Sequence, residues 1–300
     1  MDAIIVNKLR KVYQDKTAVD DVSFAVKKGE LFGLIGPDGA GKTSIFRVLT
    51  TLLLPDGGSA TVDGFDVVRD YKAIRKRAGY MPGKFSLYQD LTVEENLNFF
   101  ATVFNTTIAE NYDLIKDIYV QIEPFKKRRA GKLSGGMKQK LALCCALIHR
   151  PSVLFLDEPT TGVDPVSRKE FWEMLRQLKK QEITIIVSTP YMDEADLCDR
   201  IALIQDGKIL SIDTPSDIVH AFADKLYAVK ADQMHPLLKA LQASSLVKDS
   251  YAFGEYAHVI FEGDLQQELT TQDLTGIEIK PTPVTIEDCF IKLLKDDQNR

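Results

Sequence analysis

The chain has 300 residues, of which 45% are hydrophobic and 27% charged, and its formal net charge is −5. This composition is typical of a globular protein with one large or two modest domains, and the acidic balance argues against a nucleic-acid partner. No apolar run approaches the roughly 20 residues of a membrane-spanning helix, and the first residues lack the pattern of a secretory leader. We therefore expect a cytoplasmic chain that reaches a membrane only through a partner.

The first half of the chain predicts strands followed by helices. Residues 3–35 contain short apolar runs with period-two alternation, which indicates antiparallel strands. From about residue 91 to 122, apolar residues recur at spacings of three and four, as in a helix. A second helix is predicted over 137–149, after a double glycine and before Pro151. Together these segments predict a helical insertion at about 84–150.

The middle of the chain alternates between strands and helices. Residues 153–156 and 183–187 are continuous apolar runs, typical of strands buried on both faces. Asp164 and Pro165 predict the N-cap and first residue of the helix that follows them. Asp206-Gly207 predicts a hairpin turn. This order predicts an α/β fold with a mainly parallel sheet.

The residue pattern changes beyond about residue 222. Short helical segments there alternate with strand-like ones at 226–229, 258–261 and 277–279, which predicts a small α+β accessory domain. We therefore expect two domains, 1–221 and 222–300.

A glycine-rich run joins the apolar run at 31–35 to a helix-like segment. It reads Gly36, Pro37, Asp38, Gly39, Ala40, Gly41, Lys42, Thr43 and Ser44. Glycines allow successive N–H groups to turn inward around phosphate oxygens, and the following helix start adds a positive dipole end. Lys42 would bring an ammonium to the phosphates, and the Thr43 hydroxyl would ligate Mg²⁺. The alternative is an ordinary glycine-rich turn after a buried strand.

Two adjacent carboxylates, Asp157 and Glu158, end the apolar run at 153–156. Open α/β sheets bind ligands at the carboxyl ends of their strands. Asp157 is therefore a candidate Mg²⁺ ligand, and Glu158 is the candidate to orient or deprotonate an attacking water. The alternative is a plain transition from strand to loop.

A second glycine pair marks another helix start. The segment consists of Leu133, Ser134, Gly135 and Gly136, followed by Gln139. Backbone N–H groups and a hydroxyl at a helix start form a second candidate anion-binding terminus. The alternative is a simple N-cap, but the place of the segment between the glycine-rich run and Asp157-Glu158 favours binding.

At this point the chain resembles the ATP-binding subunit of an ABC transporter over about residues 3–220. The resemblance implies a P-loop NTPase fold, ATP and Mg²⁺ as cofactors, and ATP hydrolysis. It implies a head-to-tail pair with a second cassette, as a homodimer or a heterodimer, in which the Ser134-Gly135-Gly136 turn contacts the γ-phosphate held by the other subunit. Tyr13 would stack on adenine, with a core aromatic as the alternative, and Asp164 would lie in the dimer-contact loop.

The C-terminal segment narrows the resemblance. Residues 282–290 resemble the terminal segment of drug-resistance exporter ATPases of the daunorubicin type. The run at 36–39, with the segments at 80–82 and 85–88 downstream, resembles the multidrug-efflux branch. This implies an ABC-2-type membrane permease as partner, and a location at the cytoplasmic face of the membrane. The helical insertion would provide the docking surface, near Gly83.

Three positions depart from the family pattern. Gly83 stands where most members carry glutamine, Pro190 where most carry histidine, and Asp38 where the phosphate loop usually has asparagine. Because Pro190 has no donor for the γ-phosphate, we expect a site that binds ATP well but hydrolyses it slowly. Two other functions remain open: an ABC ATPase acting on ribosomes or nucleic acid, and a nucleotide-responsive scaffold with little turnover.

Overall fold

The computed structural model describes residues 1–84, 86–262 and 277–298. They divide into two compact units, Asp217–Lys292 and a larger one that contains Met1–Ser216 and the residues from Leu293 onward. Within these ranges, no helix has both the length and the apolar character needed to cross a membrane. Each unit has its own sheet and core.

An antiparallel sheet begins the larger unit, as the alternation predicts. Its strands have the order β2-β1-β4-β5. Their bounds are β1 (Asp2–Tyr13), β2 (Lys16–Lys27), β4 (Gly57–Val62) and β5 (Phe65–Asp66). Their buried side chains form a core with those of the first helix and the central sheet, including Leu9, Val22 and Phe46.

The central sheet has six strands in the order β10-β9-β3-β8-β7-β6. They are β3 (Leu31–Ile35), β6 (Ala78–Met81), β7 (Val153–Asp157), β8 (Thr184–Thr189), β9 (Arg200–Gln205) and β10 (Lys208–Asp213). All neighbours are parallel except β9 and β10, which form the predicted hairpin. Strands β3, β7 and β8 are buried along their whole length. Because β8 runs parallel to both β3 and β7, the carboxyl ends of all three meet at one edge of the sheet.

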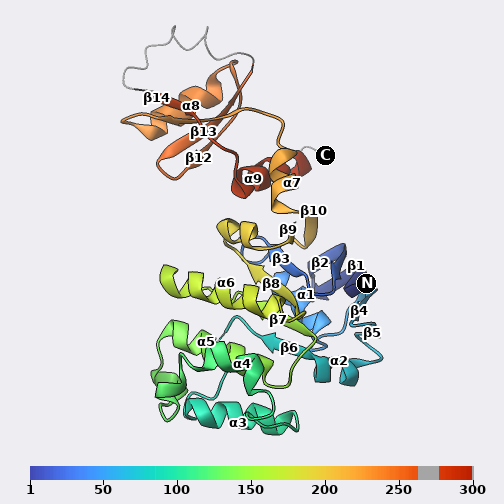
Figure 1. The fold of residues 1–300 in the computed structure, drawn as a ribbon. Coiled ribbons are helices and arrows are strands. Elements are labelled where there is room, and N and C mark those ends of the chain that lie inside the picture. Colours follow the sequence, from blue (N-terminus) through green and yellow to red (C-terminus); the bar gives the residue numbers. More distant parts are fainter. Residues whose placement is uncertain (85, 263–276, 299–300) are drawn as a thin grey trace. The chain divides into compact units, whose positions relative to one another are not determined.

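Helices lie between these strands. They are α1 (Lys42–Leu49), α2 (Tyr71–Arg77), α3 (Val93–Val103), α4 (Tyr112–Tyr119), α5 (Gly135–Leu147) and α6 (Pro165–Lys179). Helix α7 (Pro215–His220) follows β10, and most of it belongs to the smaller unit. Short 3₁₀ helices lie at Glu123–Phe125, Ala130–Lys132 and Met192–Leu197. Figure 1 shows α3, α4 and α5, drawn in green, gathered beside β6, the edge strand of the central sheet.

Two helix boundaries differ from the sequence prediction. The helical region expected over 91–122 is two helices, because Asn105 takes a positive φ of 61° just after α3. The helix expected from residue 137 begins at Gly135 instead. The Ser134 hydroxyl accepts the Met137 N–H and caps it, so both glycines belong to the first turn.

The smaller unit is an antiparallel α+β fold. Its sheet has the order β12-β13-β11-β14, with β11 (Leu226–Lys230), β12 (Val247–Phe253), β13 (Tyr256–Phe261) and β14 (Glu278–Pro281). Helix α8 (Met234–Ala243) packs on it through an apolar core that includes Leu237, Leu241 and Val259. Helix α9 (Ile286–Gln298) begins in this unit.

A buried carboxylate fixes the start of α9. Asp288 is fully buried, and its Oδ1 accepts hydrogen bonds from Tyr251 Oη at 2.9 Å and from His258 Nδ1 at 2.6 Å. Its Oδ2 accepts from the backbone N–H and the hydroxyl of Thr285, both at 2.7 Å. Asp288 therefore ties α9 to β12 and β13.

Candidate functional site

The glycine-rich run forms the loop between β3 and α1, and two of its glycines have no room for a side chain. A Cβ at Gly36 would lie 2.1 Å from the Ile204 carbonyl oxygen. Gly41 has a φ of +103°, and a Cβ there would lie 2.3 Å from the Ala18 carbonyl oxygen. The loop is therefore pressed against its neighbours, while Asp38 and Gly39 are exposed. An ordinary surface turn would not need such close packing at both ends.

Lys42 opens α1 and points its ammonium back into this loop. It is 3% exposed, and its Nζ donates to the carbonyl oxygens of Gly36 at 2.7 Å and Pro37 at 2.9 Å. The same Nζ lies 3.3 Å from Glu158 Oε1. The structure therefore brings the two residues with the main chemical roles in the sequence prediction into direct contact.

Asp157 ends β7 beside Thr43. Its carboxylate is 3% exposed, and its Oδ1 accepts from Thr43 Oγ1 at 3.2 Å and from Ser188 Oγ at 2.6 Å. A hydroxyl and a carboxylate are oxygen donors of the kind Mg²⁺ prefers, and this ion usually keeps several water ligands. The described residues hold no cluster of three or more His, Cys, Asp or Glu side chains suited to a metal.

Glu158 follows with an unusual backbone conformation. Its φ is +50°, in the left-handed region that non-glycine residues rarely adopt. The conformation is held by Ser188, whose carbonyl oxygen and Oγ both accept the Glu158 N–H, at 3.0 and 3.1 Å. Strain of this kind is concentrated at functional sites. The sequence analysis missed Ser188, whose only signal is a polar residue at the end of a buried strand.

Gly83 and Pro190, two of the positions that depart from the family pattern, also follow strands of the central sheet. Gly83 comes after β6, and a Cβ there would lie 2.9 Å from the Asp157 carbonyl oxygen. Pro190 directly follows β8. The absence of a side chain at Gly83 thus lets its loop approach the strand that carries Asp157.

Tyr13 lies near the same loop. Its Oη is 3.3 Å from Ser44 Oγ, and the residue is 40% exposed. This exposure rules out the core position that was the alternative for Tyr13. An exposed aromatic face beside the loop is available for stacking.

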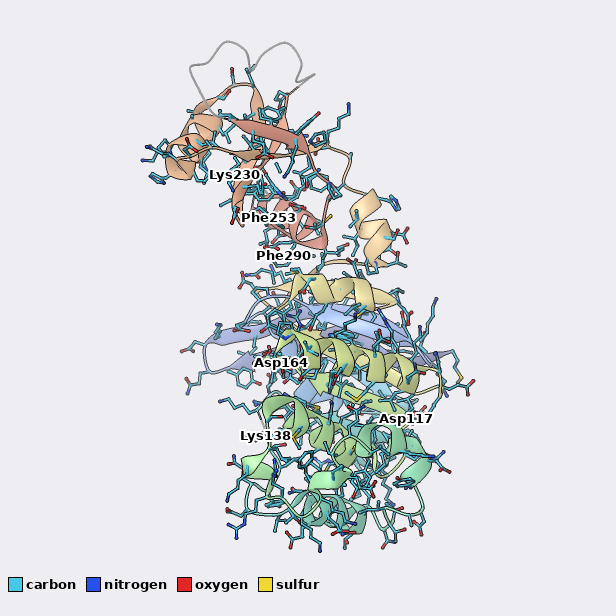
Figure 2. All side chains as sticks on the ribbon, turned by 60° about the vertical axis from the view of Figure 1, so that its left-hand side comes forward. Asp117, Lys138, Asp164, Lys230, Phe253 and Phe290 are labelled. Carbon is cyan, nitrogen blue, oxygen red and sulfur yellow. The ribbon has the colours of Figure 1, made fainter. Side chains whose placement is uncertain are left out.

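The second glycine pair lies at the junction of α5 and α6. A Cβ at Gly136 would lie 2.6 Å from Ser167 Oγ, so only glycine fits without movement. Asp164, labelled in Figure 2, caps α6 by accepting the Ser167 N–H at 3.0 Å, which keeps the pKa of its carboxyl below the usual value. Ser134 and Asp164 are both exposed, while Leu133 is buried and Gln139 half-buried. The structure thus joins these two predicted contact regions through Ser167.

An apolar cavity of about 400 Å³ lies between β6, α3 and α5. Its lining includes Leu52, Tyr80, Met81, Leu87, Phe100 and Val103, and the large apolar side chains Leu52 and Val103 are more than half exposed. His149 also lines the cavity. Its ring stacks on Phe104 at 3.7 Å and its Nε2 lies 3.2 Å from the Ala78 carbonyl oxygen. Burial lowers the pKa of His149 to about 4, so the imidazole is neutral.

Comparisons with known proteins agree with this fold. A family model described as "ABC transporter" matches residues 19–161. The chain is 40% identical to the probable multidrug ABC transporter ATP-binding protein YbhF of Escherichia coli K12, over 98% of this chain and 52% of that protein. It is 34% identical to the Nod factor export ATP-binding protein I of Paraburkholderia xenovorans, over 97% and 96%. It is 38% identical to the doxorubicin resistance ATP-binding protein DrrA of Mycobacterium tuberculosis, over 74% and 69%.

Solved structures show the same fold. The ATP-binding subunit of an ABC transporter superposes with a TM-score of 0.67 at 27% identity, over 73% of this chain and 93% of that one. A dimeric cassette, MJ0796 bound to ADP and Pi, superposes with a TM-score of 0.64 at 22% identity, over 70% and 98%.

The fold and the site define an ATP-binding cassette. The chain belongs to the family of ABC transporter ATP-binding subunits, whose members are ATPases. It spans about half the length of the YbhF relatives that it matches.

Proposed function

We propose that this chain binds ATP with Mg²⁺, hydrolyses it, and uses the cycle to drive a separate export permease. The observation that carries the proposal is the meeting of Lys42, Thr43, Asp157 and Glu158 at the carboxyl ends of β3 and β7. The names of the relatives, which refer to multidrug transport, Nod factor export and doxorubicin resistance, support the direction of transport.

Each residue has a chemical task in this proposal. The N–H groups of the loop at 36–44 and the Lys42 ammonium bind phosphate oxygens. Thr43 and Asp157 would hold Mg²⁺, which neutralises charge on the transferring phosphoryl group when it is bound. Glu158 orients the attacking water or accepts its proton. Because Lys42 pairs with Glu158 here, moving its ammonium onto phosphate also frees that carboxylate for the water.

The second cassette would use the exposed turn at Ser134. The start of α5 offers the hydroxyl of Ser134 and the backbone N–H groups of Gly135 and Gly136 to an anion. Asp164 and the 69% exposed Val166 lie at the start of α6, to which Gly136 packs closely. We assign these two helix starts to the contact with a second cassette, either another copy of this chain or a related one.

The permease would dock in the cavity between β6, α3 and α5. An apolar segment of a cytoplasmic loop of an ABC-2-type permease fits its chemistry, because Leu52, Val103 and Tyr88 present exposed apolar surface on or near it. The cavity wall includes Met81 and Pro82, which lead directly to Gly83. Docking would hold the chain at the cytoplasmic face of the membrane, with residues 1–221 as the cassette and 222–300 as an accessory domain.

The rate of this site is a further part of the proposal. Pro190 has no donor for the γ-phosphate, and Gly83 has no side chain to reach Mg²⁺ or water. Water can replace a magnesium ligand, but loss of a donor to the reacting group typically costs 10²–10³ in rate. We therefore assign slow turnover to this site. The same two losses favour a nucleotide-responsive scaffold as the second candidate function.

Phosphate release by the purified full chain separates these functions. We expect multiple turnovers in the wild type, a drop of at least about 100-fold in Glu158→Gln, and no change in the exposed control Glu182→Gln. Nucleotide affinity should survive in Glu158→Gln. ATP binding without multiple turnover in the wild type would establish the scaffold instead, and absence of ATP binding would overturn both.

A further inference from the structure

A buried carboxylate outside the motifs joins three loops of the candidate site. Glu194 lies in the 3₁₀ helix Met192–Leu197 and is 1% exposed. Its Oε1 accepts from Thr160 Oγ1 and from Arg168 Nε, both at 2.8 Å. Its Oε2 accepts from Thr189 Oγ1. A buried carboxylate is costly unless its oxygens are satisfied, and here donors from three separate segments satisfy it.

Each of these partners stands beside a residue of the site. Thr160 is two positions after Glu158, on the loop that leaves β7. Arg168 is in the first turn of α6, and its backbone N–H donates to the Asp164 carbonyl oxygen at 2.9 Å. Thr189 is the last residue of β8, directly before Pro190.

Hydrogen bonds also involve the residues on both sides of Pro190. The Thr189 hydroxyl, which donates to Glu194, accepts the backbone N–H of Tyr191 at 3.1 Å. The Tyr191 ring is covered by the Arg168 guanidinium, 4.2 Å from the ring centroid. The residues on both sides of Pro190 are thereby connected to Glu194 and Arg168.

The geometry points to Glu194 as a positioning residue of the ATPase, one that holds the Glu158 loop, the start of α6 at Asp164 and the loop at Pro190 in one fixed arrangement. The inference rests on the proposed hydrolysis. The side-chain contacts of Glu194 do not include the loop at 36–44, which meets Thr189 through the backbone, where the Gly36 N–H donates to the Thr189 carbonyl oxygen at 3.2 Å. Because that bond does not use the Thr189 hydroxyl, Glu194 should act on turnover and leave ATP affinity alone. Through Asp164 it would also link this chain's site to the second cassette.

Three variants test this role. Glu194→Gln keeps the shape of the side chain but removes its charge. Arg168 still has an anionic partner in this variant, because its Nη2 donates to both carboxylate oxygens of Asp193 at 2.9 Å. At similar volume, Thr189→Val removes both the donor to Glu194 and the acceptor of the Tyr191 N–H. Thr189→Ser keeps that donor and is the matched control.

Two measurements on the full chain decide the outcome. We expect kcat to fall at least about tenfold in Glu194→Gln and Thr189→Val but not in Thr189→Ser, with ATP affinity within about threefold of wild type. Amide hydrogen exchange in the nucleotide-free chain should become faster at 158–164 and 189–192 in the same two variants, and stay unchanged at 36–44.

The exchange measurement does not depend on turnover. If the wild type proves inactive, the proposed hydrolysis fails, while exchange still decides whether Glu194 fixes the three loops. Unchanged exchange at 158–164 in both Glu194→Gln and Thr189→Val would overturn the inference. So would a variant with faster exchange and undiminished kcat, or a loss of ATP affinity equal to the loss of kcat.

Discussion

The Nζ atom of Lys42 lies 3.3 Å from Oε1 of Glu158, so the proposed phosphate-binding cation and the proposed base form an ion pair with each other. The ammonium is buried and has two further acceptors on its own loop, which hold it at the position where β3 meets α1. Binding of a polyanion would have to compete with these contacts for the same donors.

Removal of this ammonium should therefore weaken nucleotide binding. We expect Lys42→Ala to lower ATP affinity at least about tenfold, because a desolvated charge-assisted contact to phosphate is worth more than about 1.4 kcal/mol. Titration with a fluorescent ATP analogue measures the change. Lys208→Ala, which removes an exposed lysine, is the control. Undiminished affinity in Lys42→Ala would contradict the assignment of the loop.

The close packing at Gly136 leads to a second prediction, on the stability of the chain. A methyl group there meets Ser167 Oγ at 2.6 Å and Ser167 Cβ at 2.9 Å, so Gly136→Ala should destabilise the chain by about 1–3 kcal/mol. At Gly135 the nearest atom would be 3.8 Å away, and Gly135→Ala should leave stability unchanged. Urea unfolding compares the two. Adding Ser167→Gly to Gly136→Ala should recover part of the loss, and no recovery would mean that the clash is not the cause.

His149 predicts a pH dependence of stability. Burial lowers its pKa from 6.5 to about 4, so between these values the unfolded chain binds a proton that the folded chain does not. The stabilisation of the folded chain by neutral His149 is fully present above about pH 6.5 and is lost as the pH falls toward 4. We expect a loss of roughly 2 kcal/mol between pH 7.5 and 5. Urea unfolding at both pH values measures the free energy of unfolding. For each protein, the value at pH 5 is compared with its own value at pH 7.5, and the loss should occur in the wild type and not in His149→Phe.

Asp288 should control the stability of the smaller unit. Its carboxylate accepts four hydrogen bonds without exposure to water, and in Asp288→Asn the amide nitrogen would face donors on one side. The expected loss is about 1.5–3 kcal/mol. Hydrogen exchange in β12 and β13 reports it locally. Glu287→Gln, one position earlier and exposed, should show no change.

The histidine that most members of the family carry after β8 can be restored at residue 190. Pro190→His offers a donor to the transferring phosphoryl group, and we expect kcat to rise at least about tenfold. Pro190→Ala removes the ring without supplying a donor and should stay slow. Equal rates in wild type and Pro190→His would show that other groups already compensate for the missing histidine.

The phosphate loop and the paired carboxylates could be predicted because their signals are local. A glycine run between an apolar strand and a helix has few other readings, and Asp164-Pro165 marks a helix start by chemistry alone. Ser188 and Glu194 could not be predicted in this way. Ser188 meets Asp157 and Glu158 only because β8 lies beside β7, and Glu194 meets Thr160 and Arg168 only because the loop after β7 and helix α6 fold back to it.

Edge strand β12 was also missed. Its sequence, Val247–Phe253, carries Lys248 and Asp249 and is buried only at Ser250, so it lacks the alternation that identifies a strand with one face in the core. Charged residues are common on edge strands, where they prevent pairing with other chains. The start of α5 was placed too late because the glycine pair weakens helix propensity while Ser134 still caps the helix.

The left-handed backbone at Glu158 limits how such an enzyme can lose its activity in evolution. A β-branched or bulky residue at this position would strain the turn and disturb the Ser188 contacts, so most single replacements would harm folding as well as catalysis. The positions after β6 and β8 need no left-handed backbone, although a side chain at residue 83 would lie against the Asp157 carbonyl oxygen, 2.9 Å from a Cβ there. A different residue at 190 therefore leaves the Glu158 turn itself intact, and this chain combines Gly83 and Pro190 with that turn.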